Sequence, residues 1–183
     1  DKHQSVYCQI TPSDGVALGG QETSNAVTVL NSAPTLSVPV ISASVFNNDS
    51  LLSCSTMSAD VDGDSLTESI VWRNLSSGAL LGTGASLQLS AASADPLDSI
   101  ECSITVEDSE GATAAAASTV QLANRLPQMG TVSITPASGN NTSSFDCAAS
   151  PTDSDADALT LAYEWSNART GQVLASSAAL QLT

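Results

Sequence analysis

Hydrophobic and polar residues alternate along most of this chain, in short runs separated by stretches rich in Gly, Asn, Asp and Ser. Alternation with a period of two is typical of a β-strand that buries one of its faces. No run shows the period of an amphipathic helix, so the pattern predicts an all-β chain. In the middle of the chain it predicts strands at residues 34–45, 50–57, 67–75, 85–90, 99–107 and 116–123. The alanine run at 114–117 is assigned to a hairpin connection rather than to a helix.

The pattern repeats after 93 residues. Cys54 and Cys147 are separated by this distance, and so are Trp72 and Trp165. The triplet Leu-Gln-Leu recurs at the same spacing. A period of this length exceeds the roughly 20–50 residues of solenoid repeats. It is close to the length of a small β-sandwich domain, which has about 100 residues.

The repeat divides the chain into three segments. The sequence around Cys8 matches the sequence around Cys102 at an offset of 94 residues. Residues 32–124 therefore form one complete repeat, and residues 1–31 correspond to the last two strands of an earlier one. Residues 125–183 correspond to the first strands of a later repeat.

The spacing of the four cysteines favours structural disulfides over a zinc site. Zinc-binding cysteines come in pairs about two to four residues apart, whereas these cysteines are isolated from one another. Cys54 and Cys102 fall on the second and fifth predicted strands, and Trp72 falls on the third. A disulfide between these strands (B and F), with a tryptophan on strand C, is the core signature of an immunoglobulin-type β-sandwich. Such a bond implies an oxidising compartment, and Trp165 is the corresponding core residue of the next repeat.

Cys8 and Cys147 have no partner within their own incomplete segments. If residues 1–31 of one copy completed residues 125–183 of another, these two cysteines would form the equivalent bond. Three interpretations stay open: a stretch of a long covalent array, separate subunits that donate strands to one another, or a fragment with ragged ends. Head-to-tail donation between identical copies need not close on itself and can build a filament.

Two short acidic stretches, DVDGDSL and DSDADAL, occupy equivalent positions in the repeat. Alternating carboxylates suit Ca²⁺, which takes six to eight oxygen ligands. The alternative is a solvated turn, because Asp and Gly favour turns. The candidate metal ligands are Asp60, Asp62, Asp64 and Asp108 for the first stretch, and Asp153, Asp155 and Asp157 for the second, with Asp14 contributed by a neighbouring copy.

Charge and composition argue against several classes of function. The chain has 4 Lys and Arg residues against 19 Asp and Glu residues, a formal net charge of −15, which disfavours nucleic acid and anionic membrane surfaces as partners. No apolar run approaches the roughly 20 residues needed for membrane insertion. His3 is the only histidine, and no catalytic constellation accompanies it, so we predict that the chain is not an enzyme.

Two glycosylation sequons fall at the same position of the repeat. They begin at Asn48 and Asn141, in the turn between the first two strands. This turn is the predicted position for N-linked sugar.

The order of these features resembles a known class of proteins. The series runs from Cys54 through DVDGDSLTESIVW and LQL to ECSITVEDSEG and LAN. It is similar to the tandem immunoglobulin-like repeats of giant bacterial extracellular surface proteins, which are related in pattern to polycystic-kidney-disease-type and cadherin-like modules. The resemblance covers the whole chain and implies an extracellular or cell-surface location and, in some members, bound calcium. Ala156 departs from the pattern, because it stands where the first acidic stretch has Gly63.

Together these features predict tandem immunoglobulin-like β-sandwiches with a structural role. The predicted function is a repeat unit of an extracellular filament, stalk or surface fibre. Its predicted partners are identical copies, joined by strand complementation or as a long covalent array. The alternative function is an adhesin segment that binds glycans or another cell surface.

Overall fold

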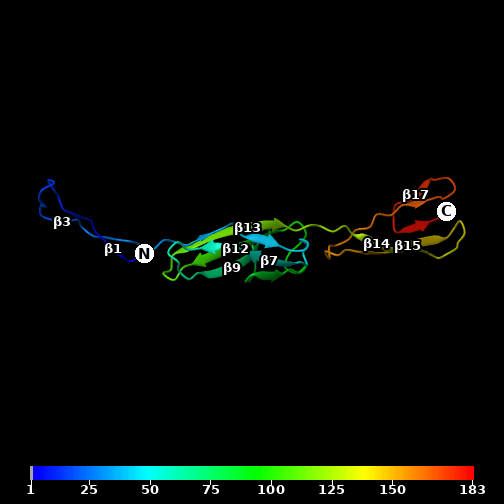
Figure 1. The fold of residues 1–183 in the computed structure, drawn as a ribbon. Coiled ribbons are helices and arrows are strands. Elements are labelled where there is room, and N and C mark those ends of the chain that lie inside the picture. Colours follow the sequence, from blue (N-terminus) through cyan, green and yellow to red (C-terminus); the bar gives the residue numbers. More distant parts are fainter. Residues whose placement is uncertain (1) are drawn as a thin grey trace. The chain divides into compact units, whose positions relative to one another are not determined.

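The computed structural model describes residues 2–183, which form β-strands and connections and contain no helix (Figure 1). Accordingly, nothing in this described part of the chain is a helix that could cross a membrane. The chain divides into two compact units, and each is described by itself. The first unit contains the described residues up to Ser44 with Leu51–Gln88 and Ser99–Gln121, and the second contains Val45–Ser50, Leu89–Asp98 and Leu122–Thr183.

The larger strands of the first unit form two antiparallel sheets. The strands that follow its first hairpin are β5 (Thr35–Leu36), β6 (Val40–Ser42), β7 (Leu51–Ser55), β8 (Ser58–Ala59), β9 (Thr67–Asn74), β10 (Leu80–Thr83), β11 (Ser86–Gln88), β12 (Ser99–Glu107) and β13 (Thr113–Gln121). One sheet has the order β10–β9–β12–β13, and the other has the order β11–β7–β6. A small additional sheet pairs β5 with β8.

A disulfide joins these two sheets. Cys54 on β7 is bonded to Cys102 on β12, which is the bond expected from the sequence. Successive side chains of a strand point to opposite faces, and alternate residues of β12 are accordingly buried. The apolar side chains buried in this unit, besides the two cysteines, are Ile41, Leu52, Trp72, Leu87, Ile100, Ile104 and Val106.

The first unit begins with a long hairpin, which we call the N-terminal hairpin. Its strands are β1 (Ser5–Val6), β2 (Gln9–Ile10), β3 (Glu22–Thr23) and β4 (Val27–Thr28). β1 pairs with β4 and β2 pairs with β3, and every residue of these strands is exposed. Val6 pairs with Val27, as Ile100 pairs with Val120 between β12 and β13. Gln9 pairs with Thr23, as Ser103 pairs with Ala117, so the hairpin repeats the pairing of β12 and β13 apart from a one-residue shift between its two pairs of strands.

The second unit repeats the other main strands of the first. Its strands are β14 (Gln128–Thr135), β15 (Ser144–Thr152), β16 (Trp165–Ser166), β17 (Val173–Ala175) and β18 (Ala179–Gln181). Ile134 on β14 pairs with Cys147 on β15, as Ile41 on β6 pairs with Cys54 on β7. In the same way, β15–β18 repeats β7–β11 and β16–β17 repeats β9–β10. None of the strands described in the second unit corresponds to β12 or β13.

The structure differs from the predicted strands in several places. The strand predicted at 34–45 is split into β5 and β6, because Pro39 lies between them and has no N–H to donate to a sheet. The alanines at 114–117, assigned to a connection, lie within β13 and pair with β12. The sequence pattern does not predict β10, which pairs with β9 through an irregular register.

Candidate functional site

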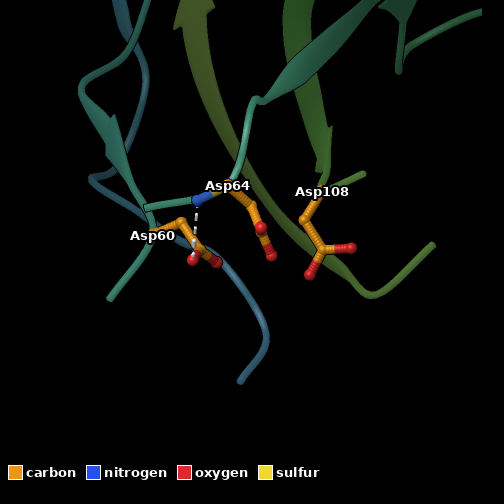
Figure 2. A group of neighbouring side chains, drawn as sticks. All are labelled: Asp60, Asp64 and Asp108. Atoms are coloured by element: carbon orange, nitrogen blue, oxygen red, sulfur yellow. Dashed lines mark hydrogen bonds between the residues drawn. The ribbon is translucent and has the colours of Figure 1, made fainter. Parts of the chain in front are cut away.

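The first acidic loop, residues 60–64, brings carboxylates from two connections together. One oxygen from each of Asp60, Asp64 and Asp108 lies within 4.8 Å of the others, as Figure 2 shows. Asp60 holds the turn, because its Oδ1 accepts hydrogen bonds from the N–H groups of Asp62 (2.8 Å) and Asp64 (3.3 Å). Gly63 has a φ of 79°, a conformation that glycine adopts without steric cost. Hard oxygen donors in this arrangement could hold a metal ion.

A basic side chain already contacts this loop. The Lys2 ammonium forms ion pairs with the carboxylates of Asp64 and Glu110. The hydrogen bond to Asp64, which is the largest cause, and the hydrogen bond to Glu110 raise the pKa of Lys2 above its ordinary value. In contrast, Oδ2 of Asp60 is buried and has no hydrogen-bond partner within residues 2–183. This oxygen of Asp60 is therefore available as a ligand for a bound cation.

Asp108 is held in one orientation by bonds to both of its carboxylate oxygens. Oδ1 accepts the N–H groups of Glu110 and Ala112, both at 2.9 Å. Oδ2 accepts a hydrogen bond from Nδ2 of Asn31 at 2.8 Å. These bonds, with that from Asn31 the largest cause, lower the pKa of Asp108. The carboxylate is therefore kept charged although the residue is only 5% exposed.

Two of the predicted ligands lie outside the acidic groups of the single chain. Asp62 accepts a hydrogen bond from the N–H of Ser32 at 2.7 Å. Asp14 lies in the turn of the N-terminal hairpin, where its Oδ1 accepts the N–H groups of Val16 (2.9 Å) and Ala17 (2.8 Å). These backbone bonds, with that from Ala17 the larger cause, lower the pKa of Asp14. Its predicted place beside the second acidic loop concerns a contact between copies and stays a prediction.

The second acidic loop, residues 153–157, also gathers three carboxylates, those of Asp153, Asp155 and Asp157. Asp155 is 2% exposed, and both of its oxygens are bonded by Arg125. The backbone N–H of Arg125 donates to Oδ2, and its Nε donates to Oδ1 at 2.8 Å. Asp155, as the largest cause, raises the pKa of Arg125. A protein cation thus neutralises the most buried carboxylate of this loop.

The structure contradicts the predicted glycosylation of Asn48. This side chain is 1% exposed, and its Nδ2, the atom that would carry the sugar, donates a hydrogen bond to the carbonyl oxygen of Asp155 at 2.8 Å. Its Oδ1 accepts a bond from Arg125 at 3.1 Å. Asn141, at the equivalent position, is exposed, and its glycosylation stays a prediction.

Lys2 and Arg125 both form ion pairs with the acidic loops, and neither pairing was predicted from the sequence. A signal was present, because only four Lys and Arg residues occur in the chain. Arg125 also directly follows Asn124, which repeats Asn31. The pairing itself requires side chains far apart in the sequence to meet, which the alternating pattern does not reveal.

The second unit contains an open groove with a volume of about 350 Å³, which we call the groove. It lies over β14 and β15 and the segment that leads into β16. Most of the side chains around it are apolar. They include Met129, Val132, Ile134, Cys147, Tyr163 and Trp165.

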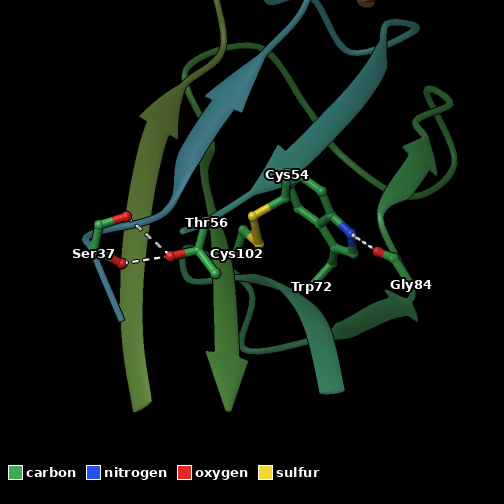
Figure 3. Close-up of a disulfide and its surroundings, with 6 residues drawn as sticks. All are labelled: Ser37, Cys54, Thr56, Trp72, Gly84 and Cys102. Atoms are coloured by element: carbon green, nitrogen blue, oxygen red, sulfur yellow. Dashed lines mark hydrogen bonds between the residues drawn. A yellow bond between two sulfur atoms is a disulfide. The ribbon is translucent and has the colours of Figure 1, made fainter. Parts of the chain in front are cut away.

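In the first unit, β12 pairs with β9 beside Trp72, and its Cys102 is bonded to Cys54. Trp72 is completely buried beside the disulfide of Cys54, and its Nε1 donates a hydrogen bond to the carbonyl oxygen of Gly84 at 2.8 Å (Figure 3). Trp165 makes the same bond to Ser177, also at 2.8 Å. Trp165 is nevertheless only half-buried, so its predicted core position is incompletely covered within the chain.

The N-terminal hairpin carries apolar residues at the positions that correspond to the buried face of β12. Val6, Cys8 and Ile10 occupy alternate positions, and their repeat counterparts in β12 are completely buried. Val6 is 51% exposed and Ile10 is 65% exposed. Cys8 and Cys147 are both free thiols within the described chain. The hairpin and the groove are therefore two exposed apolar surfaces, each with one free cysteine.

No protein family, curated protein or solved structure matches this chain. Its class must accordingly be inferred from its own geometry. That geometry comprises an all-β chain with a sheet-joining disulfide, an open groove, an exposed hairpin and two acidic loops.

Proposed function

We propose that this chain is a structural repeat unit of an extracellular fibre, in which the N-terminal hairpin of one copy fills the groove of another. One observation carries the proposal. The second unit repeats the strands of the first except β12 and β13, and the N-terminal hairpin repeats the pairing of those two strands with a one-residue shift. The hairpin thus supplies the strands that the second unit lacks.

The product of this contact would be an immunoglobulin-like β-sandwich. In such a fold two antiparallel sheets face each other, with a disulfide between strands B and F and a tryptophan on strand C. In support of this, β7, β9 and β12 carry Cys54, Trp72 and Cys102, and the two cysteines are bonded to each other. In the completed second unit, Cys147 and Trp165 would take the same roles, with Cys8 supplied by the other copy.

Hydrophobic burial supplies the driving force. Complete burial of a valine or isoleucine side chain stabilises a protein by about 1.5–3 kcal/mol. Val6 and Ile10 of the hairpin would cover Val132 and Ile134 of the groove, and all four are more than half exposed in the single chain. The contact joins two different surfaces, so it is head-to-tail, and it builds an open fibre when the rotation between successive copies does not close a ring. The same contact forms whether copies are separate chains or successive segments of one longer chain.

A disulfide between Cys8 and Cys147 would lock the contact in an oxidising compartment. With oxidised glutathione as the oxidant, one thiol first forms a mixed disulfide and releases one reduced glutathione. The second thiolate then displaces the other glutathione. Two protein thiols are thereby oxidised, while one glutathione disulfide is reduced to two thiols. The existing Cys54–Cys102 bond supports the extracellular location that the proposal requires.

Two cysteine variants test the proposal. Cys8→Ser retains the thiol in the groove, and Cys147→Ser retains the thiol on the hairpin. In glutathione redox buffer, only a mixture of the two should form a disulfide-linked dimer, visible on a non-reducing gel. The unaltered chain should form fibres under the electron microscope. No dimer in the mixture, or equal dimer yields in the separate samples, would overturn the proposal.

The proposal also assigns Ca²⁺ to the first acidic loop. The support is the set of oxygens from Asp60, Asp64 and Asp108, together with the buried, unpaired Oδ2 of Asp60. Ca²⁺ prefers such carboxylate oxygens. The Lys2 ammonium contacts Asp64, so the ion and this ammonium would compete for one carboxylate.

A further inference from the structure

We infer that Asn124 recognises Asp14 of the incoming hairpin, through a hydrogen bond between two copies from Nδ2 of Asn124 to Oδ2 of Asp14. The inference rests on the proposed function and names the polar contact that selects the correct partner and register. An apolar groove alone would accept many hydrophobic strands. A hydrogen bond at the far end of the hairpin would accept only one that places an aspartate there.

The first unit supplies the geometry for this contact. Asn31 donates from its Nδ2 to Oδ2 of Asp108 at 2.8 Å. Oδ1 of Asp108 is occupied by backbone N–H groups of its own turn, so Asn31 binds the oxygen that the turn leaves available. The contact connects the segment that enters β5 with the turn between β12 and β13.

Asp14 has the internal bonds of Asp108 but not the external one. Its Oδ1 accepts two N–H groups of its own turn, those of Val16 and Ala17. Oδ2 of Asp14 is thus the atom that corresponds to the one bound by Asn31. Asp14 lies in the turn of the N-terminal hairpin, just as Asp108 lies in the turn between β12 and β13.

Asn124 has the backbone setting of Asn31. The residue after Asn31 is Ser32, whose N–H donates to Oδ2 of Asp62 at 2.7 Å. The residue after Asn124 is Arg125, whose N–H donates to Oδ2 of Asp155. Asp62 and Asp155 are 93 residues apart, as are the two asparagines. The N–H of Ala123 also donates to the carbonyl oxygen of Phe46 at 2.7 Å, so the backbone is fixed on both sides of Asn124.

The side chain of Asn124 is exposed in the single chain. On complementation, the turn that carries Asp14 would reach the end of the second unit where the second acidic loop lies. Asn124 would then meet Asp14 as Asn31 meets Asp108. Hydrogen bonds to a charged group that becomes buried contribute enough to change affinity by about tenfold or more.

The test uses the two cysteine variants as an acceptor and a donor. The acceptor carries Cys8→Ser, so only its groove can be disulfide-linked, and the donor carries Cys147→Ser, so only its hairpin can be. The dissociation constant is obtained from the yield of disulfide-linked dimer against donor concentration. Asn124→Ala in the acceptor should raise it about tenfold or more. Asn31→Ala in the acceptor is the matched control and should leave it unchanged, since its partner is in the same chain.

Exchanging the two side chains distinguishes the loss of this hydrogen bond from a general disruption of the fold. Asp14→Asn in the donor retains one oxygen for its own turn, but presents an amide to Asn124. Asn124→Asp in the acceptor would place a carboxylate against Asp14. Each single change should weaken association about tenfold or more, whereas the two together should restore it to within about threefold of the parent pair.

The outcomes separate this inference from the proposal on which it rests. If the parent acceptor and donor form no specific dimer, the proposed function fails. If they do, but Asn124→Ala changes the dissociation constant less than about twofold, only the inference is overturned. Additive losses in the polarity swap, without restoration, would overturn it as well.

Discussion

Ile10 of the N-terminal hairpin should contribute strongly to assembly. It is 65% exposed in a single chain, whereas its repeat counterpart Ile104 is completely buried. Complete burial of an isoleucine is worth about 1.5–3 kcal/mol, and truncating a buried one to alanine costs about 2–5 kcal/mol. Because about two-thirds of Ile10 would become buried on insertion, Ile10→Ala should weaken association by about 2 kcal/mol. This corresponds to about 30-fold in the dissociation constant.

The same disulfide-linked dimer assay measures this effect, with Ile10→Ala in the donor. The matched control is Val16→Ala. Val16 is 96% exposed in the same hairpin, but its repeat counterpart, Glu110, is also exposed in the first unit, so this change should leave the dissociation constant unaltered. A loss below about threefold for Ile10→Ala, or an equal loss for Val16→Ala, would refute the assignment of Ile10 to the buried face.

Two further predictions concern the disulfide and the first acidic loop. Replacing both Cys54 and Cys102 with alanine should lower the free energy of unfolding by about 4 kcal/mol, from the loop-entropy relation for a sequence separation of 48. Urea denaturation followed by Trp72 fluorescence, in a Trp165→Phe background, measures this loss, and a value below about 1 kcal/mol would contradict the prediction. Ca²⁺ should raise the thermal unfolding midpoint because it binds the folded loop; Asp60→Asn should abolish the rise, and Lys2→Ala should shift it to lower Ca²⁺ concentration by removing the competing ammonium. A Ca²⁺ response that persists in Asp60→Asn would exclude this site.

The alternating pattern predicted the bounds of a strand accurately where the alternation was regular. The strand predicted at 99–107 matches β12 residue for residue, since its apolar residues alternate without interruption. The pattern failed at Pro39, where a missing N–H divides one apolar run into two strands. It also failed at Ala114 and Ala115, which precede the strand predicted at 116–123. Alanine has low intrinsic strand preference, and these two residues belong to β13 because β12 pairs with them.

The spacing of the carboxylates predicted the acidic loops, but not the side chains that bind to them. Regular intervals between carboxylates are visible in the sequence, and the structure brings Asp60, Asp64 and Asp108 together. Whether a side chain is satisfied depends instead on residues distant in the chain. Lys2 forms an ion pair with Asp64, which is 62 residues away in the sequence. Asn48 is buried and hydrogen-bonded to Asp155 and Arg125. A sequon carries no information about such burial.

The Cys54–Cys102 bond also limits how far the chain can be stretched. If the proposed fibre were pulled from its two ends, tension would pass along the backbone and, once the sheets separate, through this bond. The residues between the two cysteines, a sequence separation of 48, would reach roughly 160 Å if fully extended, and the covalent link withholds that length. A domain that yields would release only the chain outside the bond. The material would be stiff and would extend little under load, because the residues between the two cysteines could not unfold into extended chain.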